Sequence, residues 1–447
     1  MKELLTKIQS KSCIIEIYGL GYVGFPLAVK LSSVGFNVIG IDVNEERISR
    51  LKRNELQDSE EILKEKFLEC RKEKLELSEQ PAKNEIEKIG IICVPTPIPD
   101  KNTMSDIFVI KAVKNFLNNS KEGDCLILES SVEVGTTEKV QKLIEEKGFK
   151  IGINFGLSFC PERIDPSNKE WGIENIPRII YSSDDLTFKI SKEVYNNVNK
   201  GNLIRVEYPK IAEVVKSFEN AFRLVNISLV NELAILCDNL GINVKSVIDA
   251  AATKPFGFLP HYPGAGAGGH CIPKDPRFLL ESAKKFQGNF ATIENALKIN
   301  KKMPEYISNS LKDSIKKLGL KKSILVSGLS YKSNVEDMRD SASFKVINEL
   351  VSSGYEVFGY DPFFREEIIK KYLIENNLKE INFKLVKNLN DEILEEISCI
   401  CIVQHHDITI DQINEIYEKA KVPLIYDCQN KIKNNPNSKT ILDSLGN

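Results

Sequence analysis

Short apolar runs alternate with amphipathic segments along the first third of the chain. Apolar runs of this length predict buried strands, and segments whose apolar positions recur every three or four residues predict helices. The expected strands are Cys13 to Tyr18, Asn37 to Asp42, Ile89 to Pro95, Cys125 to Ser131 and Asn154 to Cys160. Alternation of this kind is typical of a parallel sheet with crossover helices. The charged stretch Asn54 to Lys88 is expected to form surface helices.

The middle of the chain carries one long periodic segment. From Pro209 to Leu240 the apolar residues keep helical spacing until Gly241, which predicts a single long helix. Further helix is expected as far as about Leu318, interrupted by the Gly/Pro-rich segment Lys254 to Asp275. A central helical domain is therefore expected.

The last third of the chain returns to alternating strands and helices. The expected strands are Ser323 to Gly328, Tyr355 to Asp361, Cys399 to Gln404 and Leu424 to Cys428. The chain is thus expected to be an α/β protein in which two Rossmann-like, doubly wound parallel-sheet domains are joined by a central helical domain with one long helix. The expected domain boundaries are 1–205, 206–318 and 319–447.

Composition and charge exclude several functional classes. The 447 residues, 42% hydrophobic and 28% charged, suit a globular protein of two or three domains. A net charge of −2 with mixed signs gives no field for nucleic acid or anionic lipid, and no uninterrupted apolar run reaches the length of a membrane span. The stretch Met1 to Ser10 lacks the apolar region of a secretory signal. A cytoplasmic protein without nucleic-acid or membrane partners is expected.

The ten cysteines and four histidines show no spacing typical of a metal site or a disulfide framework. Cys399 and Cys401 alternate with isoleucine in an apolar run, so they are expected to be buried strand residues. The pair His405 and His406 follows that run, and the sequence assigns it no role. No metal is expected.

A dinucleotide-binding fingerprint follows the first expected strand. The segment Gly19 to Gly24 has the spacing G-x-G-x-x-G and opens a helix, and Asp42 ends the next strand. Gly19, Gly21 and Gly24 are expected to let the backbone turn and approach a pyrophosphate at the helix N-terminus. Asp42 is expected to bind the ribose hydroxyls and to repel a 2′-phosphate, which favours NAD over NADP. A glycine-rich turn that only serves packing is the competing interpretation, and the strand, helix and acid together favour binding.

A second glycine-rich segment, Gly264 to Asp275, contains Cys271. Glycines here are expected to let the backbone lie against a bulky anionic ligand. The run Gly268 to Cys271, followed by Pro273 to Asp275, resembles the nucleophile motif of the UDP-glucose/GDP-mannose dehydrogenase family. Other segments resemble that family in the same order, and they are Gly19 to Gly24, Ser130 to Val132, Gly135 to Thr137, Pro161 to Arg163, Lys216 to Asn220, Asn231 to Leu233, Gly328 to Lys332 and Asp337 to Ser341.

The resemblance implies an NAD-dependent, four-electron oxidation of a nucleotide sugar at C6. In such enzymes a hydride leaves C6 to give an aldehyde, a thiolate (here Cys271) adds to it, a second NAD oxidises the thiohemiacetal to a thioester, and water releases the acid. Lys216 and Asn220, four residues apart on the predicted long helix, are expected to stabilise an oxyanion. Glu162 and Asp275 are both candidates for the group that activates water, and the sequence leaves open which one acts.

The resemblance also implies the remaining contacts. Ser131 stands where the family usually has threonine, and its hydroxyl is expected to anchor a water or contact the cofactor. Lys332 and Arg339 are expected to meet the nucleotide sugar and the cofactor, respectively. The other expected cofactor contacts are Tyr22, Val23, Arg47 and Thr96, and the other expected substrate contacts are Arg163, Phe258, Tyr262, Gly264, Gly268 and His270.

The expected sugar follows from three places in the chain. His270 before the nucleophile resembles the branch of the family that oxidises UDP-N-acetylhexosamines. Thr253 to Phe258 and Glu162 to Pro166 resemble enzymes that oxidise UDP-N-acetylglucosamine more than those that use the mannosamine epimer. UDP-N-acetylglucosamine, oxidised to UDP-N-acetylglucosaminuronate, is the expected substrate, and the mannosamine epimer and UDP-glucose remain alternatives. A two-electron hydroxyacid dehydrogenase and a non-catalytic nucleotide sensor rank lower, because the nucleophile, the lysine and the acids are all present. A homodimer through the helical domain is expected, as in similar proteins.

Overall fold

The structure is a computed structural model that describes residues 1–56, 58–82, 86–96, 106–165, 168, 170–269, 271–376, 378 and 383–447. The chain forms two compact units. The first consists of Met1–Glu219 with Arg277–Asn289, and the second of Asn220–Pro276 with Phe290–Asn447. The predicted helical domain is thus divided between the two units, and the three-domain boundaries stay a prediction.

Eight strands of the described residues form the sheet of the first unit, in the order β3-β2-β1-β4-β5-β6-β7-β8. The strands are β1 Ile14–Tyr18, β2 Asn37–Ile41, β3 Leu75–Ser78, β4 Lys88–Ile92, β5 Cys125–Leu128, β6 Gly156–Phe159, β7 Arg178–Ser182 and β8 Leu203–Val206. The helices are α1 Lys2–Gln9, α2 Gly24–Ser33, α3 Glu45–Lys52, the 3-10 helix η1 Asp58–Leu63, α4 Lys64–Cys70, α5 Ile107–Leu117, α6 Thr136–Glu146 and α7 Asp185–Asn196. The first six strands have the order of a doubly wound dinucleotide-binding sheet.

All five strands expected in this unit are confirmed, each within three residues of its predicted ends. Three strands were not predicted, namely β3 and β8 at the two edges and β7 beside β8. β3 lies inside the charged stretch that was expected to be helical, and only alternate residues of it are buried, so its apolar signal is short. The five predicted strands pair in parallel, as expected, and the antiparallel pair is between β6 and β7, a strand that was not predicted.

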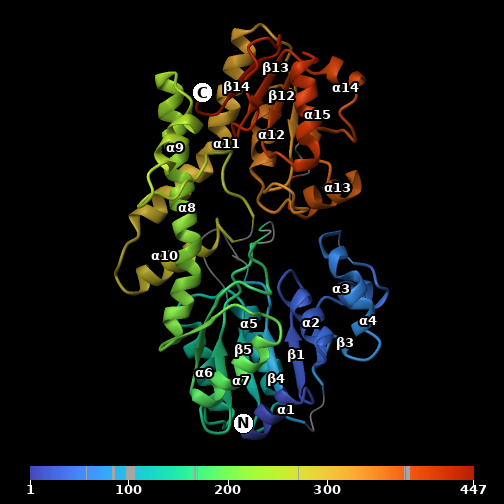
Figure 1. Ribbon diagram of the computed structural model, residues 1–447, viewed down its shortest axis with the longest axis vertical. Coiled ribbons are helices and arrows are strands. Elements are labelled where there is room, and N and C mark those ends of the chain that lie inside the picture. The colour runs from blue at the N-terminus through green and yellow to red at the C-terminus, as the bar shows by residue number, and fades with distance from the viewer. Residues whose placement is uncertain are drawn as a thin grey trace. The chain divides into compact units, whose positions relative to one another are not determined.

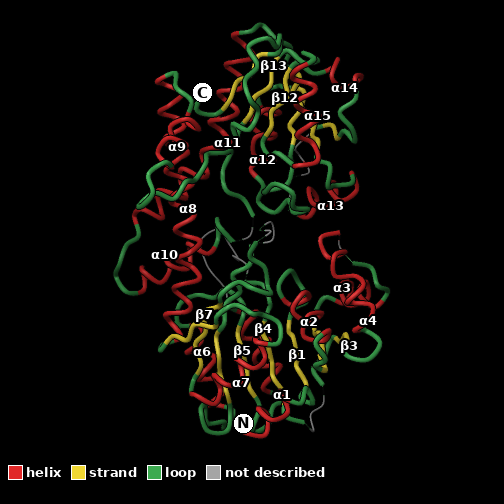
Figure 2. Tube along the Cα trace, viewed as in Figure 1, coloured by secondary structure: helices red, strands yellow, loops and turns green. Residues whose placement is uncertain are grey.

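Six strands of the second unit form an entirely parallel sheet in the order β11-β10-β9-β12-β13-β14. They are β9 Ser323–Ser327, β10 Glu356–Tyr360, β11 Lys384–Leu385, β12 Cys399–Ile402, β13 Leu424–Asp427 and β14 Ile441–Ser444. The helices are α9 Val244–Ala252, α11 Ala291–Lys317, α12 Ala342–Ser352, α13 Glu366–Glu375, α14 Asp391–Glu396 and α15 Asp407–Glu418. Helices lie on both sides of these strands (Figure 2). The four predicted strands are confirmed, and β11 and β14, at the two edges, were not predicted.

The predicted long helix is α8, Pro209–Leu240, which Figure 1 shows as one uninterrupted ribbon. It passes from the first unit into the second, and α10, Asp275–Lys285, also contributes to both. Among the described helices α8 is long and apolar enough to cross a membrane by length and composition, with a mean hydropathy of 1.2 over 18 residues. This is weak evidence, since the long helix of a globular core passes the same test.

The two sheets place the same turn at the same position. Gly19 after β1 and Gly328 after β9 have φ angles of +93° and +86°. Asp42 after β2 accepts a hydrogen bond from the backbone N–H of Leu20 (2.8 Å), and Asp361 after β10 accepts one from that of Leu329 (2.7 Å). The two ends of the chain therefore share their architecture, although their sequences show no evident repeat.

Candidate active site

The three fingerprint glycines of the first unit have different surroundings. A Cβ on Gly19 would lie 2.8 Å from the carbonyl oxygen of Cys93, and one on Gly24 would lie 1.9 Å from that of Gly19. No described atom lies within 4 Å of the corresponding position at Gly21. Gly19 and Gly24 are thus required by the packing of the turn and the helix, whereas Gly21 leaves its side of the loop open. This arrangement fits a pyrophosphate that approaches the backbone at the N-terminus of α2.

Asp42 stands at the carboxyl end of β2, as expected. Its carboxylate accepts hydrogen bonds from the backbone N–H groups of Leu20 (2.8 Å) and Asn44 (2.9 Å), which orient it beside the glycine loop. Arg47 on α3 donates from Nε to the carbonyl oxygen of Leu20 (3.0 Å), and its guanidinium group pairs with Glu60. Arg47 therefore holds the loop Gly19 to Gly24 in place through the carbonyl oxygen of Leu20.

The other expected cofactor contacts lie on neighbouring loops of this unit. Tyr22 is exposed and Val23 half-buried at the start of α2. Thr96 follows β4, Ser131 follows β5, and the Thr96 hydroxyl donates to the carbonyl oxygen of Ser131 (2.7 Å). The fold thus brings Thr96 and Ser131 into direct contact at the carboxyl edge of the sheet, where open α/β sheets bind their ligands.

Glu162 and Lys216 interact within the first unit. Burial raises the pKa of Glu162 above its ordinary value, and the charge of Lys216 and a hydrogen bond from the backbone N–H of Ile164 act in the opposite direction. Lys216 is only 9% exposed although it carries an ammonium group. A buried carboxyl whose pKa is raised is suited to accept and release a proton, and a buried ammonium group is suited to stabilise an oxyanion.

Arg163, next to Glu162, makes a structural contact. Its guanidinium group pairs with Glu219 on α8 and donates to the carbonyl oxygen of Pro177 (2.7 Å). Glu219 stands three residues after Lys216 on the same helix. Arg163 therefore fixes the segment of Glu162 to the part of α8 that carries Lys216.

A buried ion pair that affects the pKa of Glu162 was not predicted from the sequence. Arg178 on β7 and Glu129 after β5 are 4% and 2% exposed, and their nearest charged atoms lie 3.0 Å apart. Tyr195 donates its hydroxyl to the same carboxylate, and Arg178 also donates to the carbonyl oxygen of Cys160 (3.1 Å). Both charges act on the pKa of Glu162, which Arg178 lowers and Glu129 raises. A lone arginine in a short apolar strand was the only signal in the sequence.

Cys271 lies in the second unit and is exposed, unlike the other nine free cysteines, of which eight are buried and Cys93 is half-buried. Its carbonyl oxygen accepts the backbone N–H of Asp275 (2.8 Å), so the thiol stands one turn before α10. Asp275 is fully buried, and its Oδ2 accepts a hydrogen bond from Asn220 Nδ2 (2.7 Å). Lys274 Nζ lies 3.6 Å from Oδ1 of Asp275, and among the described residues no group donates a hydrogen bond to that oxygen.

The pairing of Asp275 with Asn220 brings two predicted catalytic residues together, and the backbone of Cys271, four residues before Asp275, is hydrogen-bonded to that of Asp275. A buried carboxylate oxygen without a donor costs free energy unless a ligand or water satisfies it. Among the described residues Oδ1 of Asp275 thus has an ion pair with Lys274 but no hydrogen-bond donor, and such an oxygen is suited to accept a hydrogen bond from a water.

The glycines before Cys271 pack closely against other residues of the chain. A Cβ on Gly268 would lie 2.6 Å from the carbonyl oxygen of Asp340, and one on Gly269 would lie 2.6 Å from the ring of Tyr331. Gly269 also has a φ of +80°, which L side chains rarely adopt. The expectation that these glycines serve the approach of a ligand is thus incomplete, because a loop of the second sheet lies against them.

The remaining expected substrate contacts lie in the second unit. Phe258 and Tyr262 are 40% and 45% exposed, and the backbone N–H of Gly264 donates to Asn231 on α8 (3.0 Å). Lys332 is half-buried after β9, and Arg339 is bound by Asp337 (2.7 Å). Tyr262 donates to Asp249 (2.7 Å), which orients its ring along the glycine-rich segment. His270 and Pro166, to which sequence predictions were attached, lie outside the described residues.

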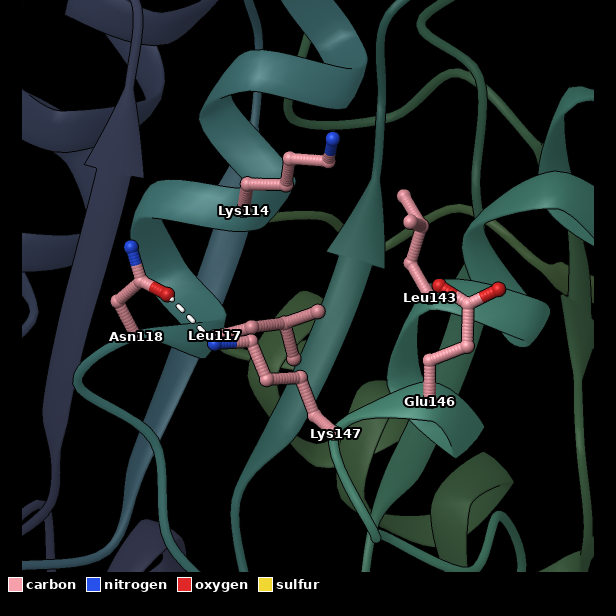
Figure 3. Close-up of a pocket in the computed structure, with 6 residues that line it drawn as sticks. All are labelled: Lys114, Leu117, Asn118, Leu143, Glu146 and Lys147. Carbon is pink, nitrogen blue, oxygen red and sulfur yellow. Dashed lines mark hydrogen bonds between the residues drawn. The ribbon is translucent and has the colours of Figure 1, made fainter.

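Two further observations concern possible sites other than the predicted one. Among the described residues no group of three or more His, Cys, Asp and Glu side chains is placed to hold a metal ion. A hollow of about 330 Å³ lies between α5 and α6, lined by Lys114, Leu117, Asn118, Leu143, Glu146 and Lys147 (Figure 3). None of the predicted site residues lines it.

Three consecutive segments of the chain match one protein family. Residues 13–199 match the NAD binding domain of the UDP-glucose/GDP-mannose dehydrogenase family, residues 210–302 its central domain, and residues 325–434 its UDP binding domain. The matched residues cover most of the chain and include the fingerprint loop, the α8 residues and the cysteine segment.

Individual relatives give the same result. The UDP-N-acetyl-D-mannosamine dehydrogenase of Methanococcus maripaludis is 33% identical over 429 residues, which are 94% of this chain and 92% of that protein. The UDP-N-acetyl-D-glucosamine 6-dehydrogenase of Salmonella typhi is 34% identical over 369 residues, which are 80% and 84% of the two chains. The structure of a UDP-D-ManNAc dehydrogenase from Pyrococcus horikoshii has a TM-score of 0.82 at 28% identity and covers 97% of this chain and 99% of that one.

Proposed function

The chain belongs to the UDP-glucose/GDP-mannose dehydrogenase family, and on this premise we propose that it oxidises C6 of a UDP-N-acetylhexosamine from alcohol to carboxylate. The observation that carries the proposal is the exposed Cys271, four residues before Asp275, whose buried carboxylate is paired with Asn220. A two-electron alcohol dehydrogenase needs no such nucleophile, whereas a four-electron enzyme uses it to hold the aldehyde for a second oxidation. NAD is the cofactor, as the matched NAD binding domain indicates.

The first oxidation requires a hydride acceptor and a proton acceptor. NAD, held by the loop Gly19 to Gly24 and by Asp42, would supply the hydride acceptor for both oxidations. Lys216 is buried with its positive charge, so it stabilises the alkoxide that forms as the C6 hydroxyl loses its proton. Glu162, whose pKa is raised by burial and which interacts with Lys216, serves as a proton acceptor.

Cys271 carries the second half of the reaction. Its thiolate adds to the C6 aldehyde, and the resulting thiohemiacetal loses a second hydride to give a thioester. Asn220 and Lys216, one helical turn apart, stabilise the oxyanion that each addition creates. Asp275 orients or deprotonates the water that hydrolyses the thioester and returns Cys271 to its thiol, through the carboxylate oxygen that no described group donates to.

Two observations bear on the sugar. The segments around Glu162 and Thr253 resemble enzymes that act on UDP-N-acetylglucosamine. The mannosamine dehydrogenase of Methanococcus maripaludis is similar over 94% of this chain, including the UDP binding domain, against 80% for the glucosamine enzyme of Salmonella typhi. We therefore rank the mannosamine epimer first and UDP-N-acetylglucosamine second, with UDP-glucose third.

Initial rates of NADH formation with each of the three UDP-sugars test this assignment. We expect kcat/KM for one N-acetylhexosamine to exceed that for UDP-glucose at least about tenfold, because a site that hydrogen-bonds an acetamido group is left with unpaired polar atoms by a hydroxyl. A preference for UDP-glucose would contradict the assignment of an N-acetylated sugar, and no NADH with any of them would contradict the proposed function.

Asp42 gives a prediction for the cofactor. Its carboxylate stands beside the open side of the glycine loop, so Asp42→Ala removes the acceptor for the ribose hydroxyls. Hydrogen bonds to a charged group contribute about 1.5–3 kcal/mol, which corresponds to a rise of roughly 10- to 100-fold in KM for NAD. The preference for NAD over NADP should narrow, because the repulsion of a 2′-phosphate is lost. Steady-state kinetics with both cofactors measure this, and Glu45→Ala, an exposed acid on α3, is the control that should change neither value.

The exposed face of α8 supports a homodimer. Phe222, Leu229, Leu236 and Leu240 follow one face of the helix at intervals of seven, seven and four residues and are 47%, 60%, 52% and 59% exposed. Contiguous exposed apolar side chains of this size are typical of an association surface, and a spacing of seven suits a second copy of the same helix. We propose that two copies pair through this face.

Light scattering tests the homodimer. We expect wild type at about twice the 50.4 kDa of one chain, and Leu229→Asp with Leu236→Asp at the mass of one chain, because a charge in an apolar interface is left without a partner. Lys298→Asp, an exposed position on α11, is the control and should leave the mass unchanged. A monomeric wild type, or a double variant that stays dimeric, would show that this face is not the interface.

A further inference from the structure

His406 follows β12, is fully buried and has no assigned role. Its Nδ1 accepts a hydrogen bond from the backbone N–H of Asn334 (3.0 Å), so the ring proton is on Nε2. Nε2 lies 3.2 Å from Oδ2 of Asp361 and 3.2 Å from the hydroxyl of Ser330. The imidazole therefore spans the two ends of the turn from Ser330 to Asn334, with one nitrogen as acceptor and the other as donor.

The neighbours of His406 hold the same turn at further points. Gln404 donates from Nε2 to the carbonyl oxygen of Tyr331 (3.2 Å). The side chain of Asn334, a residue with a φ of +60°, accepts the backbone N–H of Asp407 (2.9 Å). His405 Nε2 pairs with Asp427 (2.9 Å), which anchors this segment to the end of β13. The turn that carries Lys332 is thus fixed by residues 404–407.

The loop that contains this turn, residues 328–341, packs against Gly268 and Gly269, which come shortly before Cys271. Its Tyr331 ring and Asp340 carbonyl occupy the places where side chains at Gly269 and Gly268 would be. The backbone N–H of Gly269 donates to the carbonyl oxygen of Arg339 (2.9 Å). Cys271 stands two residues further on, so this loop holds the backbone as far as Gly269, just before the residue that carries the thiol.

We propose that His406 is a positioning residue for Cys271, acting through the 328–341 loop. The contacts form a continuous chain from the imidazole to the turn, from the turn to Tyr331, and from Tyr331 and Arg339 to Gly269. The same turn contains Lys332. The imidazole of His406 therefore fixes the position of Lys332 relative to Cys271. The inference rests on the proposed function only in that Cys271 is the nucleophile.

Hydrogen exchange of the whole chain, without cofactor or sugar, tests the coupling. In His406→Ala we expect backbone amides of peptides spanning 264–271 and 328–341 to exchange at least about tenfold faster, while the peptide that contains Gly19 to Gly24 is unchanged. His406→Asn places an amide oxygen near the position of Nδ1 and should restore much of the protection, because the Asn334 contact is kept. kcat should fall most in His406→Ala and less in His406→Asn.

The matched control is Ile416→Ala, on the helix α15, for which His406 is the N-cap residue. Ile416 is 3% exposed and belongs to the hydrophobic core on the face of the second sheet opposite the core that contains Leu329 and Met338. Its truncation therefore destabilises the same unit without changing a contact of the turn Ser330 to Asn334. Unchanged exchange over 264–271 in both His406 variants, or an equal increase in Ile416→Ala, would overturn the proposal. Because the exchange needs no substrate, a failure of the proposed function would appear separately, as absent NADH formation with altered exchange.

Discussion

Replacement of Cys271 by serine is expected to stop acid formation, with kcat at least about 10³-fold below that of wild type. Serine keeps the size of the side chain but not the thiolate, so neither the thiohemiacetal nor the thioester forms at a useful rate. The first hydride transfer does not use the thiol, and a single burst of NADH and a trappable aldehyde should remain. Rapid-mixing absorbance at the NADH band, together with mass analysis of the sugar, measures both.

Two results would contradict this role. Full kcat in Cys271→Ser, or two NADH per sugar from that variant, would exclude Cys271 as the nucleophile. Cys70→Ala, which removes a buried thiol on α4, is the control and should keep its activity apart from a loss of stability.

Lys216→Ala is expected to lower kcat about 10³-fold, equivalent to about 4 kcal/mol of transition-state stabilisation. The ammonium group is buried, so its interaction with a developing oxyanion is weakly screened by solvent. Lys216→Arg keeps the charge but changes its geometry, and it should recover only part of the activity. Lys210→Ala, on the same helix but exposed and paired with Glu138, is the matched control and should retain kcat.

The pH dependence of kcat tests the direction in which Lys216 shifts the pKa of Glu162. Burial raises the pKa of Glu162, and the charge of Lys216 opposes that rise. Without Lys216 the pKa of Glu162 rises further, so the ionised base appears only at higher pH. The acidic limb of the kcat profile should therefore move to higher pH in Lys216→Ala and stay in place in Lys210→Ala. An unmoved limb would mean that Glu162 is not the base.

Much of the fold was predictable because its signals are local. The strands at the centre of each sheet are continuous apolar runs, and α8 keeps its period over 32 residues. The edge strands were not predictable in this way. β3 has alternating burial within a charged stretch, and β11 is two residues long, so each is defined by its partner strand.

The candidate site was predictable where a motif carries its own chemistry. The open position at Gly21 and the place of Asp42 follow from the fingerprint, and Cys271 follows from its motif. The buried pair of Arg178 and Glu129 is 49 residues apart in sequence and has no local pattern, so only the packing of β7 against β6 reveals it. His406 was not predicted for the same reason, because its partners Ser330, Asn334 and Asp361 lie in two segments that are distant from it in sequence.

The most direct test of the central claim is the number of NADH molecules formed per sugar. Purified protein would be incubated with excess NAD and a limiting amount of the preferred UDP-N-acetylhexosamine until the reaction is complete. Two NADH per sugar, with the C6 carboxylate as product, is the result that a four-electron oxidation through Cys271 predicts. One NADH per sugar, with an aldehyde as the final product, would contradict it.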